Sequence, residues 1–296
     1  MIPHVHQRAA FESFSVSAAL ILLAAAYVHG WFRLRSLHPD TLEGWRRASF
    51  FFGLFSIWVA MASPIAALDH KMLTVHMVQH LLLMTIAPPL IWLGLPVKPF
   101  LNGLPKSFVQ ALNAPLLRLA LRRIGKALTH PAVCWFAAAG TLVGWHIPAA
   151  FMMGLHFPMW HAIEQTSFLV TGLLFWWPVV QPWPAASKWP EWSILLYLFV
   201  ATLPCDILSG FLVFCDRVVY PVYISPSPAL AQAALQDQEC AAALMWTCVT
   251  VVYLIAGTIV AARLLSPNRS REDWILESHT RFSTEPPANQ PSVEVF

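Results

Sequence analysis

Stretches of apolar residues, each close to twenty residues long, recur along the chain between short polar segments. A helix of about twenty apolar residues crosses the ~30 Å hydrocarbon core of a bilayer. The pattern therefore predicts an all-α fold, a polytopic membrane helix bundle with seven transmembrane helices. These cover roughly residues 14–32, 48–66, 71–94, 132–150, 159–179, 192–214 and 240–263.

Prolines modify this pattern in two of the predicted helices. Pro64 can end the second helix early. Pro88-Pro89 should break or kink the third, because a proline inside a helix removes a backbone donor and clashes with the preceding turn. Residues 90–95 are then expected to tilt or to form a separate turn.

Two polar segments lie outside the predicted spans. Residues 104–128 mix leucines with four basic residues, which is typical of an amphipathic helix lying on the inner membrane surface. Such a helix serves as a connector or, less often, as a docking site for a partner. Residues 266–296 read as a flexible polar cytoplasmic tail that follows a membrane domain of residues 1–265.

Basic residues predict the orientation, because Lys and Arg concentrate on the cytoplasmic side. With the N-terminus outside and the C-terminus inside, only Arg8, Lys71 and Arg217 of the 18 basic residues face outward. The strongest basic cluster near the first span follows it, so that span is expected to be a permanent anchor rather than a cleaved signal peptide.

Composition supports this reading and excludes other classes. The chain is 57% hydrophobic and 11% charged, whereas soluble domains average about 25% charged residues. Fourteen Trp and nineteen Phe suit interfacial belts and lipid contact. No basic stripe suggests nucleic acid as a partner. No Gly-x-Ser-x-Gly, phosphate-binding loop or His-Glu-x-x-His is present, so an enzyme is not expected.

Histidines are distributed unevenly across the predicted bundle. Four of the twelve fall on the inner side, and the other eight fall outside or in the outer half of the membrane. The outer set is His4, His6, His70, His76, His80, His146, His156 and His161. Because the orientation was assigned from Lys and Arg alone, this asymmetry is independent of it and points to chemistry at the outer face.

Met72, His76 and His80 recur every four residues in the third predicted span, so they would share one helix face. Imidazole and thioether groups are ligands that copper prefers, especially Cu(I), although imidazole also suits zinc or iron. The alternative is a pair of histidines hydrogen-bonded to neighbouring helices. Ionisable residues inside a membrane favour the metal-site interpretation.

The fourth and fifth predicted spans supply further candidates. Pro148 turns the chain directly after His146 and can aim this imidazole inward, although a belt residue is the competing reading. His156 precedes His161, which faces Glu164 and Gln165 at i+3 and i+4. A carboxylate at this spacing can orient an imidazole or bind the ion itself. The alternative is a local hydrogen bond that only stabilises the helix.

The last two predicted spans carry supporting polar residues. Asp206 inside the sixth span should be protonated, paired or facing a polar cavity, and it can pair with an outer histidine. Asp237 starts the seventh span, where an acidic residue also suits the helix dipole. Cys215 and Cys240 flank the last outer loop, and either a disulfide or two free thiols fits.

Together these motifs resemble the CtaG family, named as caa3-type cytochrome c oxidase assembly factors. The ordered motifs are His76-Met77-Val78-Gln79-His80, Trp145-His146-Ile147-Pro148, His161-Ala162-Ile163-Glu164, Phe175-Trp176-Trp177-Pro178, Asp206 and Asp237-Gln238 with Met245-Trp246. Gln165 stands where the family often has a histidine, and Ala241, Ala242 and Ala243 stand where small glycines are expected.

The resemblance implies a seven-helix inner-membrane protein that matures a haem–copper oxidase through its copper sites. By motif, it assigns roles to His76, His80, His146, His161, Glu164, Asp206 and Asp237. The expected cargo is copper as Cu(I), ahead of zinc or haem. The expected partners are lipid, oxidase subunits and a periplasmic copper chaperone. The alternatives are a copper or other cation permease, a haem-binding membrane protein and a pure scaffold.

Overall fold

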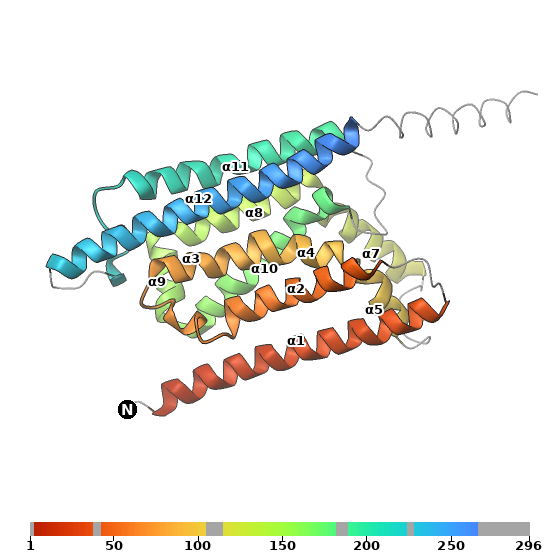
Figure 1. Cartoon of the computed structure of the whole chain (residues 1–296), viewed down its shortest axis with the longest axis horizontal. Helices are drawn as coiled ribbons and strands as arrows, with labels where there is room; N and C mark the ends of the chain where they lie inside the picture. Colours follow the sequence, from red (N-terminus) through yellow and green to blue (C-terminus); the bar gives the residue numbers. More distant parts are fainter. Residues whose placement is uncertain (1–2, 38–42, 105–114, 182–188, 224–227, 266–296) are drawn as a thin grey trace, which may run out of the picture.

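The computed structural model describes residues 3–37, 43–104, 115–181, 189–223 and 228–265, and the regular structure there is helical throughout (Figure 1). The predicted all-α class is confirmed. In chain order the helices are α1 (Pro3–Leu37), α2 (Gly44–Met61), the 3-10 turn η2 (Ala66–Leu68), α3 (Leu73–Leu81), the π-helix η3 (Leu82–Ile86), α4 (Ala87–Leu93), α5 (Val97–Gly103), α7 (Pro115–Leu128), α8 (Pro131–His146), α9 (Pro148–His156), α10 (Pro158–Val180), α11 (Glu191–Phe214), the 3-10 turn η4 (Pro221–Tyr223) and α12 (Pro228–Leu264).

Several of these helices are long and apolar enough to cross a bilayer, which makes the chain a multi-pass membrane protein. In the described ranges five helical segments meet this criterion, or six if α8 and α9, bent by 77°, form one broken span. α10 has 23 residues but is not among them. It carries the polar residues His161, Glu164 and Gln165 and packs against α4, α8 and α9.

α3 and α10 form the centre of the bundle and are enclosed by their neighbours. α12 packs against both α11 and α3, while α2 contacts α4 (Figure 1). α1 lies along one edge and contacts α2 and α5. Polar side chains on the facing sides of α3 and α10 are therefore shielded from lipid by other helices.

The Pro88-Pro89 pair is absorbed by a widened helical turn rather than by a break. Pro88 cannot donate a hydrogen bond to the Met84 carbonyl, and the chain winds as a π-helix over Leu82–Ile86. The Met84 carbonyl instead accepts a hydrogen bond of 3.1 Å from Trp176 Nε1 of α10. The segment continues as one span from Leu73 to Leu93, so the predicted separate turn is wrong.

Asp237 occupies a different position from the one that the sequence predicted. α12 begins at Pro228 rather than near residue 240, so Asp237 lies inside that helix. Its carboxylate accepts hydrogen bonds from the backbone amides of Leu73 (2.6 Å) and Thr74 (3.3 Å) and from Thr74 Oγ1 (2.6 Å). Asp237 therefore caps the N-terminus of α3 and not its own helix, which corrects the expectation from the helix dipole.

Asp237→Ala is expected to destabilise the protein by about 0.5–2 kcal/mol, the usual effect of losing an N-terminal cap. The α3 amides would lose their acceptor, and Met72 at the capping position makes no side-chain bond that could replace it. Chemical unfolding of the detergent-purified protein measures the change. Glu239→Ala, an exposed neighbour on α12, is the matched control, and equal stability of the two variants would contradict the assignment.

Four further expectations concern the periphery. Of the predicted amphipathic segment 104–128, residues 115–128 form the helix α7, and its place on the inner membrane surface stays a prediction. Residues 105–114 and the tail 266–296 lie outside the described residues. The second helix ends at Met61, ahead of Pro64. Cys215 and Cys240 are both free thiols in the described structure, so the disulfide alternative is not realised there.

Candidate metal site

His76 and His80 of α3 meet Glu164 of α10 in the interior of the bundle. The two histidines lie one helical turn apart and are 0% and 6% exposed, and Glu164 is 1% exposed. Their Nε2 atoms are 2.8 Å apart. Glu164 Oε1 lies 3.4 Å from His76 Nε2 and 3.3 Å from His80 Nε2. Three potential ligand atoms thus converge on one point, and we call these residues the carboxylate cluster.

Apart from the hydrogen bond between the two imidazoles, the carboxylate cluster lacks the hydrogen bonds that buried polar groups require. Both oxygens of Glu164 and the Nδ1 atoms of His76 and His80 have no hydrogen-bond partner in the described structure. Buried polar groups without partners are costly and rare. A tetrahedral ion with bonds of about 2.0–2.2 Å holds its ligand atoms about 3.3 Å apart. The distances from Glu164 Oε1 to the two imidazoles match this value. The two imidazoles lie in hydrogen-bond contact at 2.8 Å and would move apart by about 0.5 Å to bind a cation.

His161 extends the cluster outward to a second carboxylate. Its Nδ1 lies 3.5 Å from Glu164 Oε2, and its Nε2 lies 3.2 Å from Asp69 Oδ2 and 2.8 Å from Gln165 Nε2. Asp69, His76 and His161 can each bring one ligand atom within 4.8 Å of the others, as can His76, His80 and Glu164. His76 belongs to both groups, so the two form one continuous array.

Asp69 stays ionised at the outer end of this array. Burial alone would raise the pKa of its carboxyl, but the hydrogen bond from His161 and the neighbouring His70 outweigh burial and hold the pKa below its ordinary value. His70 Nε2 lies 3.6 Å from Asp69 Oδ1. A negative group in contact with these imidazoles favours the binding of a cation.

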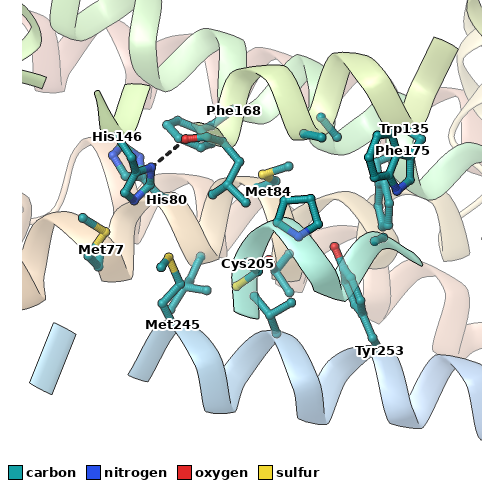
Figure 2. Close-up of a pocket in the computed structure, with 18 residues that line it drawn as sticks. Met77, His80, Met84, Trp135, His146, Phe168, Phe175, Cys205, Met245 and Tyr253 are labelled. Atoms are coloured by element: carbon teal, nitrogen blue, oxygen red, sulfur yellow. Dashed lines mark hydrogen bonds between the residues drawn. The ribbon is translucent and has the colours of Figure 1, made fainter. Parts of the chain in front are cut away.

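His146 is turned inward, as the position of Pro148 predicted. The chain bends by 77° between α8 and α9, directly after His146. Its Nδ1 contacts the Leu142 carbonyl at 2.7 Å, so Nδ1 carries the proton and Nε2 has a free lone pair. That Nε2 is buried and without a partner. His146 and His80 line one cavity of about 40 Å³ (Figure 2).

Three aromatic residues that sequence reasoning did not single out pack around the array and His146. Tyr220 donates to the His146 carbonyl at 3.1 Å, and Tyr223 donates to the Asp69 carbonyl at 2.9 Å. Phe151 stacks on Tyr220 and contacts the His76 ring edge to face. These side chains exclude water from the buried ligand atoms.

Gly154 of α9 packs directly against Glu164. A Cβ atom at this position would lie 2.5 Å from Glu164 Oε2, so the absence of a side chain is what lets the carboxylate stay in place. Asp69 is the other missed contributor. Its one sequence signal is its position beside His70 in the short segment before the histidine helix.

Besides Asp237, which caps α3, three predicted residues lie apart from both the array and the cavity beside His146. Met72 precedes α3 in an extended conformation and is 45% exposed, so the helical spacing argument does not extend to it. His156 is exposed and bonds to the Met152 carbonyl. Asp206 of α11 makes no hydrogen bond or ion pair with a histidine among the described residues. The predicted pairing of Asp206 with an outer histidine is therefore not found.

Comparisons with known proteins place this geometry in a family. Uncharacterised proteins of Mycobacterium bovis and Mycobacterium tuberculosis are each 24% identical over 271 residues, covering 87% of this chain and 40% of theirs. An uncharacterised protein of Mycobacterium leprae is 22% identical over 253 residues, covering 84% of this chain and 38% of its own length. The chain thus spans about two fifths of the length of these relatives. No solved structure matches.

The family model of the cytochrome c oxidase caa3 assembly factors matches residues 25–266. The match extends from within α1 to the end of α12 and includes every residue of the array. The description of this family gives it a role in assembling an oxidase and names no enzymatic activity. On this match, which covers most of its length, the chain belongs to the family of cytochrome c oxidase caa3 assembly factors.

Proposed function

We propose that this assembly factor holds copper in the carboxylate cluster and passes it to a subunit of a haem–copper oxidase. The observation that carries the proposal is the convergence of His76, His80 and Glu164 on one point without hydrogen bonds to the carboxylate. Imidazole nitrogens and a carboxylate form a ligand set that suits divalent cations, zinc as well as copper. The role of the family in building an oxidase favours copper over zinc.

In this proposal the chain crosses the bacterial inner membrane seven times, with the N-terminus outside and the C-terminus inside. α10 makes one of the crossings, shielded from lipid by α4, α8 and α9. The array then faces the periplasm, where a copper chaperone can load it through Asp69 and His161. The preference of Lys and Arg for the opposite side supports this orientation.

The alternatives receive less support from the geometry. A haem requires a pocket in the range of about 300–1,000 Å³ that is typical of cofactor sites. The cavity beside His80 and His146 has a volume of about 40 Å³. A cation permease needs a polar path through both halves of the bundle, and the lining of this cavity beyond the histidines is mostly apolar. Copper uptake into proteoliposomes would favour the permease.

The proposal is tested in a host strain that lacks the gene. We expect His76→Ala/His80→Ala to leave the oxidase deficient in copper and its activity at least about tenfold below wild type, because both imidazole ligands are lost. His156→Ala, which removes an exposed histidine outside the array, should restore full activity. Copper content of the purified oxidase and its activity are measured together. Full copper loading in the double variant would refute the proposal.

A further inference from the structure

The cavity beside the carboxylate cluster has a lining that the cluster's function does not explain. It lies beyond His80 between α3, α8, α10, α11 and α12 (Figure 2). Its volume of about 40 Å³ exceeds the roughly 10–15 Å³ that one water needs. Four sulfur-containing side chains line it, and they come from four different elements: Met77, Met84, Cys205 and Met245.

His146 supplies an unpaired ligand atom to this cavity. The hydrogen bond from its Nδ1 to the Leu142 carbonyl leaves the Nε2 lone pair free. His146 is 6% exposed, and its Nε2 has no hydrogen-bond partner. The Nδ1 of His80, which also lines the cavity, is likewise buried and without a partner. A buried lone pair with no donor to satisfy it indicates a ligand at this position.

The sulfur atoms define which ligand fits. Met77 and Met245 are 1% and 4% exposed, so their thioethers are removed from water. Figure 2 shows both side chains on the same side of the cavity as His80 and His146. Thioether and imidazole are soft, neutral ligands, which select Cu(I) over hard divalent cations. A neutral set in apolar surroundings also disfavours a double charge, because its desolvation is not compensated.

We propose that this cavity is a second cation site, selective for a soft monovalent ion such as Cu(I), in which His146 Nε2 and the thioethers of Met77 and Met245 are the ligands. Cys205 and Met84 also line this cavity. His80 forms the wall shared with the carboxylate cluster, so an ion can pass between the two sites across one side chain. This second site, which we call the soft site, differs from the carboxylate cluster in having no carboxylate.

Silver(I) is the probe, because it is a soft monovalent ion that does not change oxidation state under the conditions of binding. Purified full-length protein is titrated with silver(I) and, separately, with zinc(II). We expect Met77→Leu/Met245→Leu, which conserves side-chain volume, to weaken silver(I) binding at least about tenfold and to leave zinc(II) binding unchanged. Met159→Leu, at an exposed methionine of α10, is the control. Equal silver(I) affinity in the double variant and the control would overturn the proposal.

Two further measurements separate this site from the proposed function of the cluster. Glu164→Gln should weaken zinc(II) binding and retain silver(I) binding. The soft site can therefore be tested even if the carboxylate cluster proves not to bind metal. X-ray absorption of silver(I) bound to the wild-type protein does not depend on any variant folding. Sulfur neighbours in the first shell are expected, and a shell of nitrogen and oxygen alone would overturn the assignment.

Discussion

Glu164→Gln is expected to lower the affinity of the purified protein for copper(II) about a hundredfold while the fold stays intact. Three ligand atoms converge at the cluster, and two of them are the imidazole nitrogens of His76 and His80. The carboxylate oxygen of Glu164 is the only negatively charged one of the three. A cation buried in an apolar interior needs a compensating charge, and a neutral amide oxygen supplies none. Because glutamine has the shape of glutamate, it fits the space beside Gly154 that a larger side chain would fill.

The same substitution shows whether Glu164 is a metal ligand or only a contact that holds α3 and α10 together. Binding at a ligand concentration one hundred times Kd stabilises a folded protein by about 2.7 kcal/mol. With a hundredfold weaker Kd, the gain at that concentration falls to about 0.4 kcal/mol by the same relation. Wild type should therefore melt at a clearly higher temperature with copper(II) than without it. Glu164→Gln should show almost no shift with copper(II), because the second site that we propose for monovalent ions does not hold a divalent ion.

The melting temperature of the metal-free protein distinguishes a metal ligand from a purely structural residue. If Glu164 served only to tie the helices through His76, His80 and His161, its loss would destabilise the metal-free protein and copper would shift both forms equally. Glu239→Gln, at an exposed carboxylate of α12, is the control for a change of charge alone. Scanning fluorimetry with and without copper, combined with a competition titration, measures both quantities.

The sequence predicted the parts of the array that depend on helical spacing. His76 and His80 are four residues apart, and His161 and Glu164 are three apart, so each pair shares a helix face whatever the packing. The inward turn of His146 followed from Pro148, because proline at the start of α9 fixes where α8 ends. Local rules were sufficient for these residues.

The remaining parts depend on contacts between distant segments. α3 begins at Leu73 because Asp237 of α12, 164 residues away in sequence, caps its first amides. That cap leaves Met72 outside the helix, and no local pattern reveals it. Asp69 and Gly154 likewise join the array only because their segments pack against α10, Asp69 through His161 and Gly154 through Glu164.

Gly172→Ala is expected to reduce both stability and copper affinity, because α10 touches the widened turn of η3 at this glycine. A Cβ at position 172 would lie 2.8 Å from Met84 Cα, 2.9 Å from the Met84 carbonyl oxygen and 2.9 Å from Pro88 Cγ. Two of these atoms belong to the backbone and cannot rotate away. The helix must therefore shift, which costs about 1–3 kcal/mol in a packed core and strains the adjacent bond from Trp176 to Met84.

The shift would reach the metal site through the rigid geometry of α10. Gly172 and Glu164 lie on this one helix, so displacing α10 from η3 also moves the carboxylate away from His76 and His80. Gly210→Ala in α11, where a Cβ meets no atom within 4 Å, is the matched control. It should leave copper affinity unchanged and should not lower stability, because Ala favours a helix interior by about 0.5–1 kcal/mol over Gly. Unfolding and copper titration of both variants measure the effect.

Glu164→Gln should lose copper affinity alone, whereas Gly172→Ala should lose stability even without copper. A Gly172→Ala protein as stable as Gly210→Ala would show that α10 is not held at backbone contact.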